Sequence, residues 1–356
     1  MAQQWITAYK IVPEKPPRDN YPDYEVGYMY NHIGKVAVHD SGFHASPMFV
    51  QCGLYITPTP GCRYLKVHLL SPIHDDKFTT YASASIMVTE EFTYENVLVM
   101  EQVLAINGSE YYAKGFGYHR EGKDAEGNTL PAKIYNGTKE WYKDGELHRE
   151  DRDAEGNVLP ARICANGSEH WYKNGKLHRG DKDAEGYTLP AEIYANGSKY
   201  WYKDDKHHRD DKDVEGNTLP ATIYAGGSRE WYKNGECHRE DIDAEGNTLP
   251  AIITNNDHRE WCKYGKRHRE DKDAEGNTLP AVIYADGSRE WYNNGKRHRD
   301  DKDVEGNALP AVIYADGSRE WYNDGVCQTV HYADDAKNEH YQARVCTCPA
   351  WTKEKY

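Results

Sequence analysis

Aromatic and polar landmarks recur along the chain with a period of 30 residues, from about residue 118 onward. Tryptophan recurs at Trp141, Trp171, Trp201, Trp231, Trp261, Trp291 and Trp321. The His of a His-Arg pair recurs at His119, His148, His178, His208, His238, His268 and His298. The Pro of a Leu-Pro-Ala step recurs at Pro131, Pro160, Pro190, Pro220, Pro250, Pro280 and Pro310. Three independent landmarks with one period predict seven copies of one structural unit.

Within one copy, residues 281–310, the pattern favours short strands joined by tight turns. The Asp286-Gly287 and Asn294-Gly295 steps are favoured centres of hairpin turns, so three short strands are expected in each copy. The first copy is one residue shorter, and the deletion falls at 135–138, where a turn is predicted and the strand register survives it. One copy cannot bury its Trp and Tyr alone, so neighbouring copies must stack to complete the core.

Residues 1–115 carry no repeat. The segments 5–12, 24–30, 63–70 and 83–93 are predicted strands, 48–56 fits a helical turn or a strand, and 94–106 is read as a helix. The predicted fold class is mainly β: an elongated array of seven 30-residue β-hairpin repeats with a small N-terminal α+β domain. The predicted domains are 1–115, the array 116–325, and a C-terminal cap 326–356.

Composition and charge narrow the function classes. The chain has 29 Tyr and nine Trp against five Phe and five Met, which is typical of half-buried aromatic residues on sheets and argues against disorder. A formal net charge of −14 disfavours nucleic acid as a partner. No signal-like start and no run of 18 apolar residues is present, so neither secretion nor a membrane partner is expected.

The cysteines do not form a recognisable disulfide framework. Cys164, Cys237 and Cys262 stand where sister copies carry other residues. We expect their thiols to be unpaired, because none of the three substitutions is accompanied by a matching second substitution to Cys. Cys346 and Cys348 form a weak metal-binding signal.

Acidic loops between copies resemble the start of a calcium-binding loop. Asp271, Asp273, Glu275 and Gly276 match its first half, but the distal bidentate Glu and the flanking helices are missing. An acidic turn explains the loop, so no metal or other cofactor is expected in the array. The seven repeated His are likewise expected to form a structural ladder with carboxylates of the adjoining loop or copy, because an active site needs only one constellation.

Two parts of the chain resemble viral proteins. Residues 118–325 are similar to repeats with the pattern WYxNGKxHRxDGPAxxYADGS, found in hypothetical proteins of tailed phages and giant viruses and distantly akin to MORN repeats; the short DGPA step is expanded here to DKDAEGNTLPA. The segment YEVGYMYNHIGKVAVHDSGFHAS resembles an uncharacterised phage-associated domain with a YEVGKxY and SGFHAC pattern, with Ser46 in place of its Cys. These resemblances imply a phage or other viral origin, with the host cytoplasm or the virion as location.

The densest cluster of reactive side chains outside the array lies in the N-terminal domain. Ser41, His44 and Ser46 follow one another there, and Glu91 ends a predicted strand. This order resembles ADP-ribosyltransferase folds, in which a Glu orients the nicotinamide ribose. The resemblance implies NAD as cofactor. The four residues are catalytic candidates because they are polar groups that the repeat does not explain.

Two hypotheses therefore stand. In the first, the chain is a viral, non-enzymatic interaction or structural protein whose array is a rigid scaffold or recognition surface for a host or viral protein. In the second, the N-terminal domain is an enzyme of ADP-ribosyltransferase type that the array targets. Copy five departs most from the repeat, so Thr254, His258, Cys262 and Tyr264 are the predicted partner-binding residues.

Overall fold

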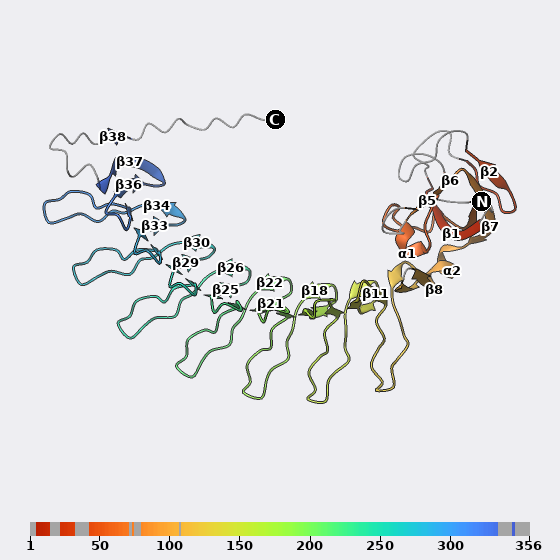
Figure 1. Ribbon diagram of the computed structural model, residues 1–356, viewed down its shortest axis with the longest axis horizontal. Coiled ribbons are helices and arrows are strands. Elements are labelled where there is room, and N and C mark those ends of the chain that lie inside the picture. Colours follow the sequence, from red (N-terminus) through yellow and green to blue (C-terminus); the bar gives the residue numbers. More distant parts are fainter. Residues whose placement is uncertain are drawn as a thin grey trace. The chain divides into compact units, whose positions relative to one another are not determined.

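The computed structural model describes residues 5–14, 22–32, 43–70, 73–74, 80–106, 108–333 and 344–345 (Figure 1). It divides into two compact units, residues 1–176 and 177–356. We number the copies by their Trp: copies one to six are residues 132–160, 161–190, 191–220, 221–250, 251–280 and 281–310, and copy seven begins at residue 311. The division between the units falls within copy two.

The N-terminal part of the first unit is built on two antiparallel sheets. One has the order β1(Trp5–Val12)-β4(Arg63–Leu70)-β7(Ser85–Phe92)-β2(Met29–Asn31), and the other β3(Phe43–Ala45)-β6(Tyr81–Ser83)-β5(Ile73–His74). Strand β4 is buried on both faces: Leu65, Val67 and Leu69 belong to one apolar cluster, and Tyr64 belongs to a second with Phe49. Two short helices, α1(Phe49–Cys52) and α2(Tyr94–Val99), complete this part.

The sequence predictions for this part hold for some segments and fail for others. The strands predicted at 5–12 and 63–70 are confirmed as β1 and β4, and the ambiguous segment 48–56 contains the helix α1. The single helix predicted over 94–106 is wrong, because α2 ends at Val99 and the chain continues as strand β8(Glu101–Ile106). Of the strand predicted at 24–30, only Met29 and Tyr30 lie in a strand, β2, because residues 26–27 form a turn with Gly27 at φ +88°.

A hairpin leads from this part into the repeats. Strand β9(Ser109–Lys114) pairs with β8, with β10(Gly117–Tyr118) and with β11(Lys133–Tyr135) of copy one. Strand β11 pairs in turn with β12(Thr138–Glu140). The deletion predicted to lie in a turn does so, because Asn136 and Gly137 join the two strands with φ +47° and +77°, the conformation of a two-residue hairpin turn.

Each copy holds two hairpins rather than the three strands expected. In copy six, β31(Val282–Ile283) pairs with β32(Arg289–Glu290), and β33(Tyr292–Asn293) pairs with β34(Lys296–Arg297). Trp291 separates them because its backbone N–H donates to the carbonyl of Ala311 in the next copy, at 2.8 Å. Figure 1 shows these second hairpins following one another along the second unit.

The first hairpins join one antiparallel sheet within each unit, whereas the second hairpin of each of copies one to six is a separate two-stranded sheet. In copy seven the second hairpin belongs to the main sheet, because one strand runs from Arg319 through Trp321 to Asn323. The remaining first-hairpin strands are β15(Arg162–Ile163), β16(Glu169–His170), β19(Glu192–Ile193), β20(Lys199–Tyr200), β23(Thr222–Ile223), β24(Arg229–Glu230), β27(Ile252–Ile253), β28(Arg259–Glu260), β35(Val312–Ile313) and β36(Arg319–Asn323). The remaining second-hairpin strands are β13(Tyr142–Lys143), β14(Glu146–Leu147), β17(Tyr172–Lys173), β18(Lys176–Leu177), β21(Tyr202–Lys203), β22(Lys206–His207), β25(Tyr232–Lys233), β26(Glu236–Cys237), β29(Cys262–Lys263) and β30(Lys266–Arg267).

After copy seven, β37(Val326–His331) pairs with β36 and with β38(Arg344–Val345). The predicted fold class, mainly β with hairpin repeats and a small N-terminal α+β part, is confirmed. No helix in the described ranges is long and apolar enough to cross a membrane.

Candidate functional site

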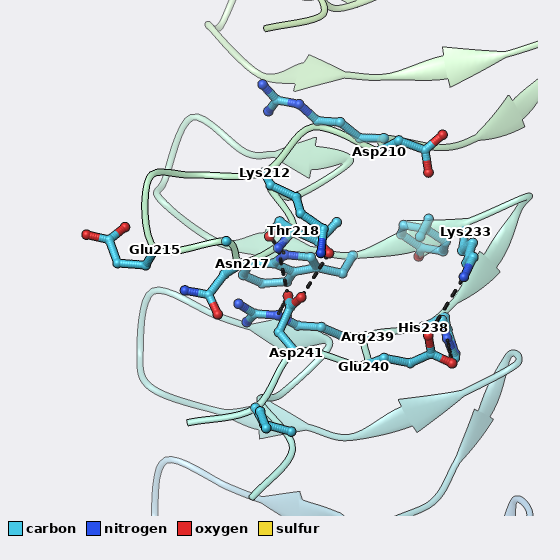
Figure 2. Close-up of a pocket in the computed structure, with 15 residues that line it drawn as sticks. Asp210, Lys212, Glu215, Asn217, Thr218, Lys233, His238, Arg239, Glu240 and Asp241 are labelled. Carbon is cyan, nitrogen blue, oxygen red and sulfur yellow. Dashed lines mark hydrogen bonds and ion pairs between the residues drawn. The ribbon is translucent and has the colours of Figure 1, made fainter. Parts of the chain in front are cut away.

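A polar groove of about 450 Å³ lies in the second unit, where copies three and four meet (Figure 2). Both copies line it, because the acidic loop of one copy reaches the Trp and the His-Arg pair of the next. The lining residues are Arg209, Asp210, Lys212, Glu215, Gly216, Asn217, Thr218, Trp231, Tyr232, Lys233, His238, Arg239, Glu240, Asp241 and Ile242.

A buried carboxylate ties the two copies together at this groove. Asp241 accepts a hydrogen bond from Arg239 Nε at 2.8 Å, and from the backbone N and the hydroxyl of Thr218 at 3.0 and 2.9 Å (Figure 2). Burial alone would raise the pKa of Asp241, but the bonds from Arg239 and Thr218 outweigh it and hold the pKa below its ordinary value. The same tie joins Asp151 to Thr129, Asp211 to Thr188, Asp271 to Thr248 and Asp301 to Thr278.

The repeated Trp side chains from Trp141 to Trp291 are all buried, whereas Trp321 of copy seven is partly exposed and its ring lies 4.5 Å from that of His331. Trp231 is 5% exposed, its indole N–H donates to the carbonyl of Thr218 at 2.7 Å, and Arg239 stacks on its ring with the guanidinium carbon 4.0 Å from the centroid. All seven indole N–H groups make the corresponding bond to the preceding loop. Each Trp from Trp171 onward therefore closes the joint between two copies, and Trp141 joins copy one to the loop that precedes it.

The rim of the groove carries the His ladder that the sequence predicts. His238 Nε2 lies 3.0 Å from Glu240, and its Nδ1 accepts a bond at 3.2 Å from the backbone N–H of Tyr264 in copy five. Lys233 lies 3.8 Å from the same Glu240 carboxylate. The buried Arg, Asp and Trp thus serve the joint, and the exposed rim offers alternating charges suited to polar contacts with another surface.

The acidic loops are closed by their own hydrogen bonds. Asp273 accepts bonds from the backbone N–H groups of Asn277 at 2.7 Å and Glu275 at 3.1 Å, while Asp271 lies 2.7 Å from Arg269 Nε. The two carboxylates of one loop therefore serve different partners. Among the described residues, no group of three or more His, Cys, Asp or Glu is placed to hold a metal ion.

We accordingly expect no tight calcium site in the array. Isothermal titration of the chain with calcium should show no saturable binding in the micromolar range, and added chelator should leave Tm unchanged, because calcium would have to displace Arg269 and the backbone donors from the two carboxylates. Saturable micromolar binding with a stoichiometry near seven would contradict this expectation.

The catalytic candidates of the N-terminal part have different surroundings. Ser46 is buried and its backbone pairs with Tyr9 of β1, and the backbone carbonyl of His44 accepts a bond from Lys10 Nζ at 2.8 Å. Glu91 lies on β7, which β4 separates from β1, and both of its carboxylate oxygens accept bonds at 2.8 Å from Arg63. Ser41 lies outside the described residues, as do Cys346 and Cys348.

Two titratable groups near Ser46 were missed by sequence reasoning. Burial lowers the pKa of Lys10 to about 8 and raises the pKa of Cys52 to about 11. The signal for Lys10 was present in the sequence, because it follows Ala8 and precedes Val12 in the alternation of β1, and all three are buried. A Lys at a strand position that alternates with buried apolar residues is expected to have a buried ammonium group.

The divergent residues of copy five lie in both of its hairpins. Thr254 and His258 close the first hairpin, where His258 Nε2 lies 2.8 Å from Glu260 and its ring is 4.9 Å from that of Tyr284. Tyr264 takes the turn of the second hairpin at φ +49° and is 57% exposed. Its ring stacks on that of His238, with centroids 4.5 Å apart and planes 19° from parallel.

Cys262 is buried, and it packs in one cluster with Trp231, Ala251 and the partly buried Cys237. Cys164, Cys237 and Cys262 are free thiols, as the sequence predicts, but the premise that no second Cys accompanies Cys262 is wrong. Cys237 precedes it by 25 positions in sequence, a separation that only the stacking of copy five on copy four brings together.

Comparison with known families extends only over the N-terminal part. Residues 6–100 match the model of a domain described as a Domain of unknown function (DUF7666). A comparison with curated proteins found no match. The matched segment ends before the first repeat.

Proposed function

We propose that this chain is a viral, non-enzymatic interaction protein whose repeat array presents a recognition surface to a protein partner. The joints support the array as a rigid scaffold: the four joints from copies two and three to copies five and six each combine an indole to carbonyl bond with a Thr to Asp tie. The joint between copies six and seven keeps the indole bond, from Trp321 to the carbonyl of Ala308. The similarity of the repeats to those of phage and giant-virus proteins supports the viral origin. The expected partner is a host or viral protein.

The observation that carries the proposal is the exposed Tyr264 in a left-handed turn. Sister copies place Asn or Asp at this position, as at Asn234 and Asn294. Those residues tolerate a positive φ, whereas a bulky aromatic residue there is uncommon and costs conformational energy. Backbone strain at an exposed aromatic side chain is typical of functional sites rather than of drift.

The chemistry around Tyr264 fits a protein partner. Tyrosine is enriched among residues that dominate binding energies, and it brings a large contact area at low entropic cost. The ring of Tyr264 also stacks on the ring of His238. An aromatic side chain that is stacked on a neighbouring ring and 57% exposed is a suitable anchor for a pocket on another protein.

The test replaces Tyr264 by the residue of the sister copies. Tyr264→Asn should leave Tm unchanged or raise it, because Asn adopts a positive φ more readily, and should weaken binding at least about tenfold. The chain first serves as bait in host lysate, and the captured protein is purified so that its affinity can be measured by titration. Reverting Thr254, His258, Cys262 and Tyr264 together to Tyr, Ser, Tyr and Asn should weaken binding further.

The matched control is Asn294→Ala in the equivalent turn of copy six, which should leave the affinity unchanged. Equal affinities of the wild type and the quadruple variant would reduce the divergence of copy five to neutral drift.

A further inference from the structure

The same two repeat positions meet at the joints between copies three and four, five and six, and six and seven. The last residue of a second hairpin contacts the residue that follows the Trp of the next copy. His207 lies 5.0 Å from Tyr232 between ring centroids, and the guanidinium groups of Arg267 and Arg297 each donate to a Tyr hydroxyl at 3.3 Å, those of Tyr292 and Tyr322. The register of the repeat therefore dictates this contact.

At the joint between copies four and five, both of these positions are cysteine. Cys237 ends β26, and Cys262 follows Trp261. The sister pairs are Leu147 with Tyr172, Leu177 with Tyr202, His207 with Tyr232, Arg267 with Tyr292 and Arg297 with Tyr322. Both positions changed to the same residue at this joint alone, so the two substitutions form one feature.

The surroundings hold the two thiols against one another. Cys262 is 8% exposed and Cys237 is half-buried, and both pack in the cluster of Trp231 and Ala251. The backbone N–H of Gly265 donates to the carbonyl of Cys237 at 3.0 Å, which fixes the turn of copy five on β26. The interaction between the two neighbouring thiols raises the pKa of Cys237 and lowers that of Cys262.

We propose that Cys237 and Cys262 are a redox-active dithiol, which a peroxide oxidises to a disulfide that joins copies four and five. The oxidant that the proposal requires is a peroxide, and hydrogen peroxide is small and uncharged. The site is a modification site of the array, separate from the N-terminal candidates. Trp231 packs against it and also lines the groove between copies three and four.

The chemistry balances over two steps. The thiolate of Cys262 attacks one oxygen of hydrogen peroxide, the O–O bond breaks, and a sulfenic acid and hydroxide form. The sulfur of Cys237 then attacks that of Cys262, the S–O bond breaks, and the hydroxyl leaves as water with the proton of the Cys237 thiol. Two thiols and one peroxide give one disulfide and two waters, and a reducing dithiol reverses the change by exchange.

Oxidation would convert a packed joint into a covalent one. The bond closes the segment between residues 237 and 262, which includes the acidic loop of copy four and the first hairpin of copy five. Amide exchange in that segment is expected to slow, because local separation of the two copies is no longer possible. The exposed Tyr264 follows Cys262 by two residues, so the modification lies beside the divergent turn.

Peptide mapping tests the proposal on the full chain. The reduced protein is treated with hydrogen peroxide, the remaining thiols are alkylated, and trypsin is added. Cleavage after Lys233, Arg239, Arg259 and Lys263 places the two cysteines in separate peptides, 234–239 and 260–263. We expect these peptides to appear as a linked pair, lighter than their sum by two hydrogen atoms, and to separate again on reduction.

Two variants and one internal control decide the outcome. Cys237→Ser and Cys262→Tyr should each abolish the linked pair, and the second restores the residue of the sister copies, so that the fold is retained. Cys327 takes the position of Cys237 in copy seven, and the position 25 residues later is Thr352 rather than Cys, so Cys327 should be recovered as an alkylated thiol. Full alkylation of both Cys237 and Cys262 after peroxide, or linkage of either one mainly to Cys327, would overturn the proposal.

Discussion

The substitution Trp231→Ala should lower the free energy of unfolding by about 3–5 kcal/mol. The change removes a side chain that is 5% exposed, leaves the carbonyl of Thr218 without its indole donor, and takes away the ring on which Arg239 stacks. Loss of buried area and loss of a hydrogen bond act together here. Chemical denaturation monitored by circular dichroism measures the difference.

The damage should be local because each copy contacts only its neighbours. Hydrogen exchange should show loss of protection in copies three to five and unchanged protection in residues 5–12 and 63–70. Trp5→Ala is the matched control: Trp5 is 43% exposed on β1, and its removal should cost less than about 1 kcal/mol. Equal loss of protection in the N-terminal sheet and in copy four would contradict the nearest-neighbour model.

The repeat array could be predicted because the sequence shows both the 30-residue period and the residues that favour tight turns. The Asn-Gly steps and the deletion at 135–138 located turns that the structure confirms, and Asn136 and Gly137 adopt the positive φ values that such turns need. The number of strands was missed because Trp291 bonds to the next copy rather than within its own strand. Such a bond leaves no trace in local periodicity.

The contacts between copies could not be predicted from the sequence. The tie of Thr218 to Asp241 spans 23 positions, and the meeting of Cys237 with Cys262 spans 25. These separations follow from the stacking offset, which the 30-residue period alone does not give. The N-terminal candidates were chosen for density along the sequence, but Glu91 lies two strands away from β1 and binds Arg63.

Asp241→Ala should cost about 3–5 kcal/mol, comparable to the loss of a Trp. The Arg239 side chain is only 8% exposed, and its Nε lies 2.8 Å from the carboxylate, so the variant buries an unpaired charge. Thr218 also loses the acceptor of its backbone N–H and hydroxyl. Equilibrium denaturation measures the difference, and the unfolding should again begin at the joint between copies three and four.

The adjacent Glu240 supplies a matched control in the same copy. Its side chain is 59% exposed and its contacts to His238 and Lys233 lie at the surface, so Glu240→Ala should cost less than about 1 kcal/mol. Similar costs for the two variants would show that the buried tie contributes nothing beyond an ordinary surface ion pair.

The pH dependence distinguishes the charge of Asp241 from its packing. Because the pKa of Asp241 is held below its ordinary value of 3.8, its contribution is fully present above that value and is lost as the pH falls through the lower pKa of the folded protein. Asp151, Asp211 and Asp271 share the shift and its direction, so their contributions disappear in the same range. The wild type should therefore lose stability steeply below about pH 4, and Asp241→Ala should lose it less steeply because one of these groups is gone. Parallel curves of unfolding free energy against pH for the two proteins would show that the carboxylate stabilises the joint by shape rather than by charge.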